Sequence, residues 1–200
     1  MQLTHFYAVS GHISLCVHSQ VIDAYLELVR KNVRNANCYA FHAEFFAHLC
    51  RTQSGHDRTL MLKEWIENNN IPDLRSLDKL LFPIEVSDHW LLVVVDFVRR
   101  TMYVVDSLLQ YPAVNRNSSL SIIRDLLLQH AKENKYERGL EQFECSILRE
   151  APQQDNGFDC GVFACVAARC IMSEKPLNYG PAEMLDFRRL IAAQLITGRL

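Results

Sequence analysis

Residues 80–106 read LLFPIEVSDHWLLVVVDFVRRTMYVVD, and this stretch determines the fold class. Three strand-like runs make it up: residues 80–86, 90–97 and 101–106. The second run is continuously apolar from Trp90 to Val95, which is typical of a central strand covered on both faces. Pro83 lacks the N–H that a ladder needs, so the first run is expected to be an edge strand or to carry a bulge. The stretch therefore predicts a sheet, with a hairpin connection at residues 98–100.

Sequence on both sides of this stretch has the apolar spacing of helices. We predict helices at residues 19–29, 39–49, 61–69, 117–132, 161–172 and 181–198, and a further strand at residues 143–147. Ser19 is the expected N-cap of the first helix, and the run Asn117-Ser118-Ser119 is expected to cap the fourth. Pro181 is expected to start the last helix and Gly198 to end it.

Length and composition exclude several classes of protein. The chain has 200 residues, of which 49% are hydrophobic and 22% are charged, so we expect one domain over residues 1–200. A net charge of −2 with scattered Lys and Arg gives no nucleic-acid footprint. The longest apolar run is far shorter than the roughly 20 residues of a membrane span. No basic flank and apolar region follow Met1, so we expect an intracellular protein.

Cysteine and histidine spacing argues against metal sites and disulfides. The seven cysteines are Cys16, Cys38, Cys50, Cys145, Cys160, Cys165 and Cys170. Their number is odd and no CxxC pair occurs, so we expect free thiols, six of them buried as small hydrophobes and Cys160 set apart. His42 and His48 are six residues apart on a predicted helix, a poor separation for two ligands of one ion. We therefore expect neither a metal nor a cofactor.

The predicted hairpin brings a histidine and an aspartate together. A turn around residues 98–100 pairs positions whose numbers sum to about 197 to 199. The numbers of His89 and Asp106 sum to 195, which leaves only a small stagger. A carboxylate beside an imidazole fixes the tautomer of the ring and stabilises its protonated form. We therefore expect His89 and Asp106 to form a catalytic pair.

A candidate nucleophile lies in the segment PQQDNGFDCG, residues 152–161. Cys160 is expected to open a helix, where backbone amides and the helix dipole stabilise a thiolate. The Cys160 N–H and the side-chain amide of Gln154 could donate to an oxyanion, an interaction whose loss usually costs about a hundredfold or more in rate. Gly157 and Gly161 would permit close backbone approach. Isolated Cys, His and Asp residues are nevertheless common, so these residues alone leave a structural role open.

Four motifs together carry a family resemblance. They are HW at residues 89–90, VVDF at 94–97, VDS at 105–107 and PQQxNGxDCGxFAC at 152–165. From about Ser19 to the last helix, the chain resembles the Ulp/SENP family of SUMO-specific proteases, which is related to the adenoviral protease. That family has the order His, Asp, Cys, and here the spacings are 17 and 54 residues. The resemblance implies an α+β, adenain-like cysteine protease fold, with a mixed sheet flanked by helices and the triad in a shallow groove.

The resemblance also implies roles for individual residues. His89 would be the general base, Asp106 its orienting carboxylate, Cys160 the nucleophile and Gln154 the oxyanion-hole donor. Trp90 would form a wall of the tunnel around the substrate's Gly-Gly tail, although it could instead be an aromatic residue of the core. We also assign Gly157 and Asp159 to substrate binding. The family's second wall is a tryptophan before the first helix, where this chain reads Leu15-Cys16-Val17-His18.

The function implied by the resemblance is cleavage after the Gly-Gly of a ubiquitin-like modifier, SUMO first, in its precursor or on a target lysine. Alternatives are another modifier such as NEDD8 or ubiquitin, another polypeptide, or a pseudo-protease that binds a modifier without cutting it. The expected partners are the modifier and its conjugates, with no nucleic acid and no membrane. We expect a monomer in the nucleus or cytoplasm.

Overall fold

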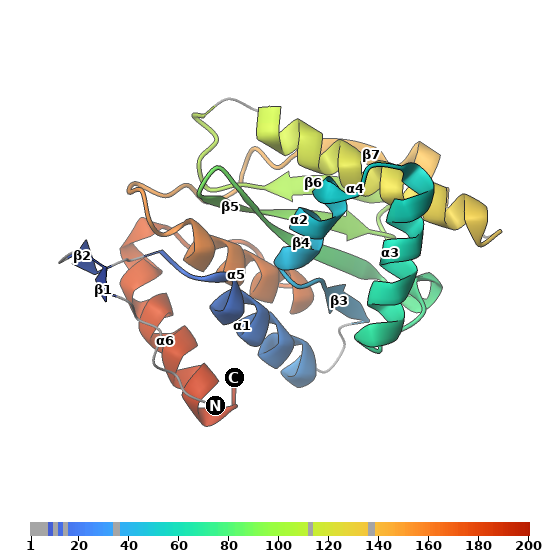
Figure 1. Cartoon of the computed structure of the whole chain (residues 1–200). Helices are drawn as coiled ribbons and strands as arrows, with labels where there is room; N and C mark the ends of the chain where they lie inside the picture. The colour runs from blue at the N-terminus through green and yellow to red at the C-terminus, as the bar shows by residue number, and fades with distance from the viewer. Residues whose placement is uncertain (1–7, 10–11, 14–15, 34–36, 112–113, 136–138) are drawn as a thin grey trace.

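The computed structural model describes residues 8–9, 12–13, 16–33, 37–111, 114–135 and 139–200 (Figure 1). The helices are α1 (Ser19–Asn32), α2 (Glu44–Arg51), α3 (Gly55–Asn68), α4 (Val114–Glu133), α5 (Cys160–Met172) and α6 (Met184–Thr197). The strands are β1 (Ala8–Val9), β2 (His12–Ile13), β3 (Cys38–Ala40), β4 (Lys79–Val86), β5 (His89–Asp96), β6 (Thr101–Val105) and β7 (Glu144–Ile147). Short 3₁₀ turns occur at Leu74–Ser76, Leu140–Gln142 and Pro181–Glu183.

Five strands form one mixed sheet in the order β3-β4-β5-β6-β7. The pairs β4–β5 and β5–β6 are antiparallel, while β3–β4 and β6–β7 are parallel. The mixed sheet of the predicted α+β fold is therefore confirmed, and β5 is its central strand. Pro83 belongs to β4, which is not an edge strand, but its pairing with β3 ends at Leu81. Because Pro83 lies beyond that point, its missing N–H removes no bond to β3.

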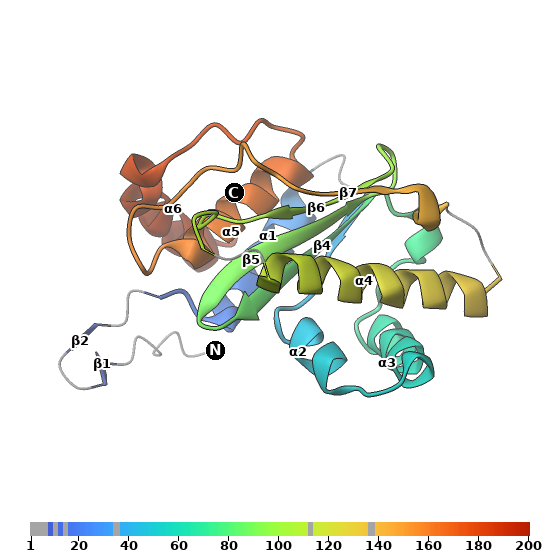
Figure 2. The same cartoon turned by 90° about the horizontal axis from the view of Figure 1, so that it is seen from above.

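Helices cover both faces of the sheet, as the view from above shows (Figure 2). Helices α1, α5 and α6 lie on one side, and α2, α3 and α4 lie on the other. The side chains of β5 alternate between the two cores: Leu92 and Val94 face α5, whereas Leu91 and Val93 face α4. All four are at most 1% exposed, and each such burial stabilises the fold by about 1.5–3 kcal/mol. The continuous apolar run of β5 is thus explained by burial on both faces.

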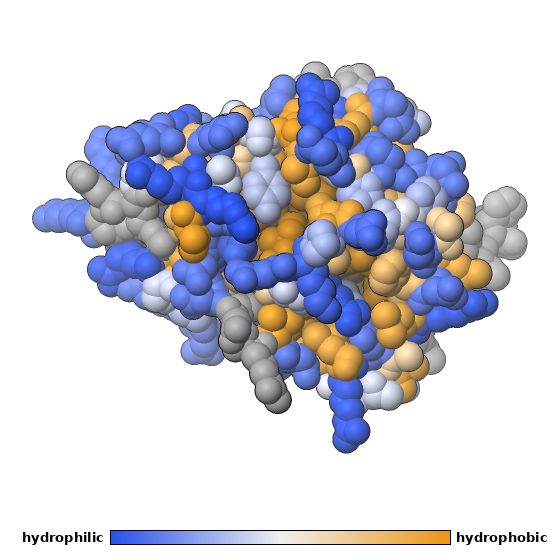
Figure 3. Space-filling view, turned by 180° about the vertical axis from the view of Figure 1, so that it is seen from behind, coloured by the Kyte–Doolittle hydropathy of each residue, from blue (hydrophilic) through white to orange (hydrophobic). Residues whose placement is uncertain are grey.

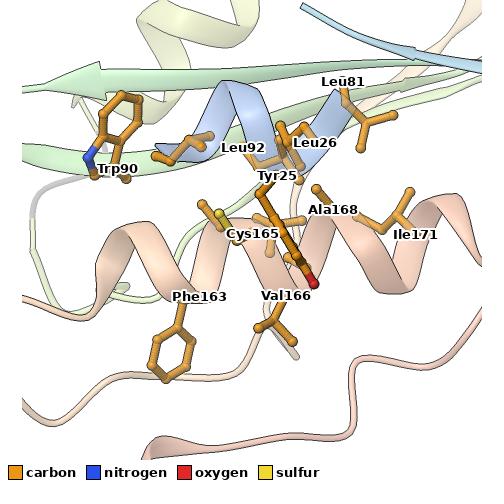
Figure 4. Close-up of a cluster of buried hydrophobic side chains, with 14 of the residues drawn as sticks. Tyr25, Leu26, Leu81, Trp90, Leu92, Phe163, Cys165, Val166, Ala168 and Ile171 are labelled. Atoms are coloured by element: carbon orange, nitrogen blue, oxygen red, sulfur yellow. The ribbon is translucent and has the colours of Figure 1, made fainter. Parts of the chain in front are cut away.

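Helix α5 passes through the middle of the core that lies between the sheet and helices α1 and α6. Small side chains such as Ala167 and Ala168 let it approach the sheet closely, and both are fully buried. Figure 4 shows Cys165 and Val166 of α5 among Tyr25 and Leu26 of α1 and residues of the sheet. The predicted helix at residues 161–172 is confirmed, and it starts one residue earlier, at Cys160.

Two of the predicted helix boundaries were wrong. Residues 39–49 were expected to be one helix, but β3 takes up Cys38–Ala40 and α2 begins only at Glu44. The strand wins there because Tyr39 and its neighbours pair with β4, a contact that is distant in sequence. The helix expected to be capped at Asn117 begins at Val114, which places Arg116 within its first turn.

Two further helices differ in detail. Helix α3 starts at Gly55, six residues before the predicted Met61, because the Ser54 hydroxyl accepts a hydrogen bond from the Asp57 N–H at 3.1 Å. Ser19 is the first residue of α1 and not its cap, which is His18 without a side-chain bond. The last helix is confirmed: Pro181 begins a 3₁₀ turn that leads into α6, and Gly198 ends it with a left-handed φ of 67°.

The cysteines are free thiols, as expected, but fewer of them are buried than expected. Cys38 and Cys165 lie in the core, and Cys170 is half-buried. Cys16, Cys50 and Cys145 are exposed, so the prediction of six buried thiols was wrong for these three. Single apolar side chains at a surface are ordinary, and Figure 3 shows apolar patches interspersed with polar and charged groups. No helix in the described part of the chain is long and apolar enough to cross a membrane.

Candidate active site

The β5–β6 hairpin brings His89 and Asp106 into contact. Its register pairs Leu92 with Val105 and Asp96 with Thr101, so paired numbers sum to 197, as the turn predicted. His89 is the first residue of β5, and Asp106 directly follows β6. The Nε2 of His89 lies 2.7 Å from Oδ1 of Asp106. Asp106 is 2% exposed, so its carboxylate is shielded from water and holds the imidazole ring in one orientation.

Cys160 is the first residue of α5 and directly follows the segment of residues 152–159. Its thiol is 3% exposed, and the His89 ring and the backbone of Trp90 and Gly161 lie close enough to lower its pKa. Nε2 of the His89 ring faces Asp106, so Nδ1 is the nitrogen left for the sulfur. This Nδ1 is buried and has no hydrogen-bond partner in the described part of the chain. The structure thus places Cys160 beside the hydrogen-bonded pair of His89 and Asp106.

The electrostatics of this cluster favour an ion pair. Burial by itself would raise the pKa of the Cys160 thiol, but the neighbouring His89 ring and the backbone of Trp90 and Gly161 lower it below its ordinary value. Burial would lower the pKa of His89, yet the bonds to Asp106 and Cys160 outweigh this effect and raise it to about 9. The pKa of Asp106 is lowered because His89, Arg116 and the Leu108 N–H outweigh its burial. The lowered pKa of Cys160 and the raised pKa of His89 both favour the thiolate–imidazolium pair over the neutral pair.

These pKa shifts predict how activity depends on pH. The reactive pair of thiolate and imidazolium forms above the pKa of Cys160. The pair is lost when the imidazolium of His89 releases its proton. Because the pKa of His89 is raised to about 9, kcat/KM is expected to stay high through neutral pH and to fall only above about pH 9. The measurement is kcat/KM of the peptidase activity expected from the sequence, from the acidic to the strongly alkaline range. An alkaline limb near the ordinary histidine pKa of about 6.5 would contradict this account.

Gln154 is held by Ser107, the residue after Asp106, and by Asn156. The Ser107 hydroxyl donates to its Oε1 at 2.6 Å, and its own Nε2 donates to the Asn156 carbonyl at 2.6 Å. An amide nitrogen carries two hydrogens, so one N–H remains for another acceptor. Gln154 is 6% exposed, which makes its orientation fixed rather than adaptable. This geometry is compatible with the predicted oxyanion role, which stays a prediction.

Gln153 was not selected from the sequence, although it lies in the same motif. Its Nε2 donates to the Asp106 carbonyl at 2.9 Å, and its Oε1 accepts from the Leu109 N–H at 2.8 Å. The next peptide adds a bond, from the Gln154 N–H to the Ser107 carbonyl at 2.9 Å. The segment before Cys160 is therefore fastened to the loop after Asp106, which keeps the nucleophile and the carboxylate in register. The only sequence signal for a role of Gln153 was its place beside Gln154 in the motif.

Trp90 is almost completely buried, being 4% exposed, and packs in the core between β5 and α5 (Figure 4). Its indole Nε1 donates to the Val17 carbonyl at 3.1 Å. A Cβ built on Gly161 would lie 2.8 Å from Val17 Cβ and 3.3 Å from Trp90 Cδ1, so only glycine fits between them. Val17 thus lies against Gly161 and Trp90, in the segment where the resembled family has its second tryptophan and this chain has none. The tunnel role of Trp90 stays a prediction.

The two other predicted substrate contacts have different surroundings. Gly157 is exposed, and a Cβ added there would meet no atom within 4 Å, so nothing in the described chain crowds it. Asp159 is 4% exposed, and its carboxylate already accepts bonds from Arg188 and from Asn156, at 2.8 Å and 2.7 Å. Asp159 therefore joins the Cys160 segment to α6, which makes it a support of the site. A direct contact of Gly157 or Asp159 with substrate stays a prediction.

Among the described residues, no group of three or more His, Cys, Asp or Glu side chains could hold a metal ion. The histidine at position 48 lies beside Glu44, 3.9 Å away, and His42 lies edge-on to Trp65. Their surroundings are those of ordinary helix and surface residues.

A mixed sheet between two helical layers, with a cysteine at a helix start facing a histidine and an aspartate, defines the architecture of a cysteine peptidase. Residues 16–198 match the Ulp1 protease family, C-terminal catalytic domain, and the chain belongs to that family. This confirms the resemblance seen in the sequence.

Individual relatives are consistent with this family. The chain is 28% identical to ubiquitin-like-specific protease 1 of Saccharomyces cerevisiae over 185 residues, which covers 92% of this chain and 28% of the yeast protein. It is also 28% identical to human sentrin-specific protease 5, covering 92% of this chain and 23% of that protein. The chain therefore spans about a quarter of the length of these relatives.

Solved structures share the fold. The C-terminal Ulp1 protease domain in complex with Smt3, the yeast ortholog of SUMO, matches with a TM-score of 0.77 and 25% identity, covering 92% of this chain and 77% of that one. The Ulp1-like SUMO protease catalytic domain of Chaetomium thermophilum matches with a TM-score of 0.71 and 25% identity, covering 92% and 73%. The adenain-like α+β fold predicted from the sequence is therefore confirmed.

Proposed function

We propose that this chain is a cysteine protease and isopeptidase that cleaves after the C-terminal Gly-Gly of a ubiquitin-like modifier. The observation that carries the proposal is the hydrogen bond between His89 and Asp106, with Cys160 beside the same His89 ring. Family membership supports the same chemistry. No metal or cofactor takes part in the proposed reaction, since the thiolate and imidazolium supply the nucleophile and the acid.

The proposed reaction has two steps. The Cys160 thiolate attacks the carbonyl carbon of the terminal glycine, and the oxyanion that forms accepts hydrogen bonds from the Cys160 N–H and the Gln154 side chain. His89 gives its proton to the leaving amine, the C–N bond breaks, and a thioester remains. Neutral His89 then takes a proton from water, which attacks the thioester and releases the glycine carboxylate. Asp106 stabilises the imidazolium throughout.

SUMO is the first choice of modifier in this proposal, as a precursor or attached to a target lysine. The support comes from relatives, since one similar structure holds Smt3, the yeast ortholog of SUMO, and another is a SUMO protease domain. Glycine has no side chain, so a Gly-Gly tail would fit a tunnel with Trp90 as one of its walls. Action as a monomer in the nucleus or cytoplasm belongs to the same proposal.

The test compares cleavage of SUMO, NEDD8 and ubiquitin precursors that carry the same C-terminal extension. The expected result is the highest kcat/KM for SUMO, with a Gly-Ala variant of its tail cleaved far more slowly. Faster cleavage of NEDD8 or ubiquitin would replace SUMO as the substrate but retain the chemistry. Saturable binding of a modifier without any cleavage would identify a pseudo-protease and overturn the proposed reaction.

A further inference from the structure

A buried arginine faces the side of Asp106 that His89 does not use. Nη1 of Arg116, in the first turn of α4, donates to Oδ2 of Asp106 at 2.5 Å. The other carboxylate oxygen, Oδ1, faces His89 and accepts from the Leu108 N–H at 2.8 Å. The side chains of Arg116 and Asp106 are 5% and 2% exposed. The carboxylate is therefore held from two opposite directions, by an imidazole and by a guanidinium.

The same guanidinium fixes the loop that follows β6. It donates to the carbonyl of Leu108 at 3.1 Å, to that of Leu109 at 3.3 Å, and to that of Tyr111. A guanidinium has five donors in a rigid plane, so it can bind a carboxylate and several carbonyls at once, which a lysine cannot. Arg116 thus connects Asp106, the loop that supplies the Leu108 N–H, and the start of α4.

We propose that Arg116 is a positioning residue of the reaction. It holds the Asp106 carboxylate in the orientation that aligns His89. Its positive charge also weakens the attraction of that carboxylate for the proton on His89. This inference rests on the proposed function, because it concerns the same triad. Within the described part of the chain, the bonds of the Arg116 guanidinium go to Asp106 and to the loop after β6, and none goes to Cys160 or His89, so Arg116 acts through Asp106. A carboxylate free to turn would misalign the imidazole, and small misplacements of a catalytic group can cost on the order of a hundredfold in rate.

The charge of Arg116 has a separate, measurable consequence. The titratable or charged groups that influence Asp106 are His89 from β5 and Arg116 from α4, and Cys160 from α5 joins through His89. Removing the positive charge leaves the Asp106 carboxylate less compensated. Protons are then held more tightly by both His89 and Cys160, because each now experiences a more negative potential. The whole pH–rate profile should move to higher pH.

The experiment uses Arg116→Met, which removes the charge, and Arg116→Lys, which keeps it. For Arg116→Met we expect kcat to fall by about tenfold or more and KM to change little. We also expect the acidic and the alkaline limb of the pH–rate profile to move to higher pH. For Arg116→Lys we expect the limbs to return to their original pH with kcat only partly recovered, because lysine cannot reach the carbonyls. Arg124→Met is the matched control: it removes another α4 arginine, which donates to the Glu141 carbonyl at 3.2 Å, and should leave kcat and both limbs unchanged.

Alkylation of Cys160 by iodoacetamide supplies a readout that needs no modifier. It is followed on the peptide that contains Cys160, because Cys16, Cys50 and Cys145 are free and exposed as well. Its pH dependence reports when the thiolate forms, so it tests Arg116 even if the unaltered protein cleaves none of the three precursors. The upward shift in Arg116→Met and its absence in Arg116→Lys are the expected results. The proposal would be overturned if the pH profile of a folded Arg116→Met protein coincided with that of the unaltered protein. A shifted pH profile in Arg116→Lys would overturn it as well. If Arg116→Met fails to fold, kcat of Arg116→Lys decides: a partial loss of kcat is expected, and a kcat equal to that of the unaltered protein would overturn the positioning role.

Discussion

Cys160→Ala is expected to lower the rate of modifier cleavage by on the order of 10⁴-fold or more, because no other group supplies the nucleophile. Binding should persist, since the thiol is 3% exposed and alanine keeps the Cβ and the start of α5. The measurements are kcat with a SUMO precursor and, separately, the Kd for mature SUMO.

Cys165→Ala is the matched control for that loss. Cys165 lies five residues further along α5, fully buried, and burial raises the pKa of its thiol to about 12, so it remains a neutral core group. Turnover by Cys165→Ala should equal that of the unaltered protein at temperatures where both are folded. Substantial cleavage by Cys160→Ala would show that Cys160 is not the nucleophile. Loss of turnover in a folded Cys165→Ala protein would also contradict the assignment.

His89→Ala is expected to have a comparable effect, lowering turnover by roughly 10⁴-fold. Without the imidazole, the sulfur loses its strongest partner, while burial still disfavours the thiolate. The pKa of Cys160 should therefore rise, and its alkylation by iodoacetamide near neutral pH should slow. The measurement is the alkylation rate as a function of pH, beside kcat for the precursor.

His48→Ala is the control for this second prediction. His48 is an exposed residue of α2, with 48% of its side chain accessible, and its nearest charged neighbour is Glu44 of the same helix. Neither turnover nor the alkylation profile should change in His48→Ala. An alkylation profile in His89→Ala that coincides with that of the unaltered protein would mean that His89 does not activate the thiol.

The part of the site that was predictable depends on local geometry. The contact between His89 and Asp106 follows from one short hairpin, whose register is fixed by its turn and its apolar alternation. The position of Cys160 follows from a motif that combines turn residues with the start of a small-residue helix. Both features involve residues close together in sequence, so their spacing carries the information.

Contacts between distant loops were not predictable in the same way. Gln153 and Arg116 bind backbone groups of the loop after Asp106, and such bonds depend on loop conformations that no periodicity encodes. Strand β3 was missed for a related reason: it has three residues within an aromatic run, and only its parallel pairing with β4 makes it a strand. The exposed thiols, such as Cys145 on β7, were misjudged because β7 has exposed residues along most of its length.

The most direct test of the central claim is the intact mass of this protein after incubation with SUMO, NEDD8 and ubiquitin that each carry a C-terminal vinyl sulfone. We expect a covalent adduct of one protein with one SUMO, and no adduct with the Cys160→Ala variant. That result would identify the nucleophile and the class of substrate in one experiment. An adduct that persists in Cys160→Ala, or none with any of the three modifiers, would contradict the proposal that Cys160 attacks the C-terminal carbonyl of such a modifier.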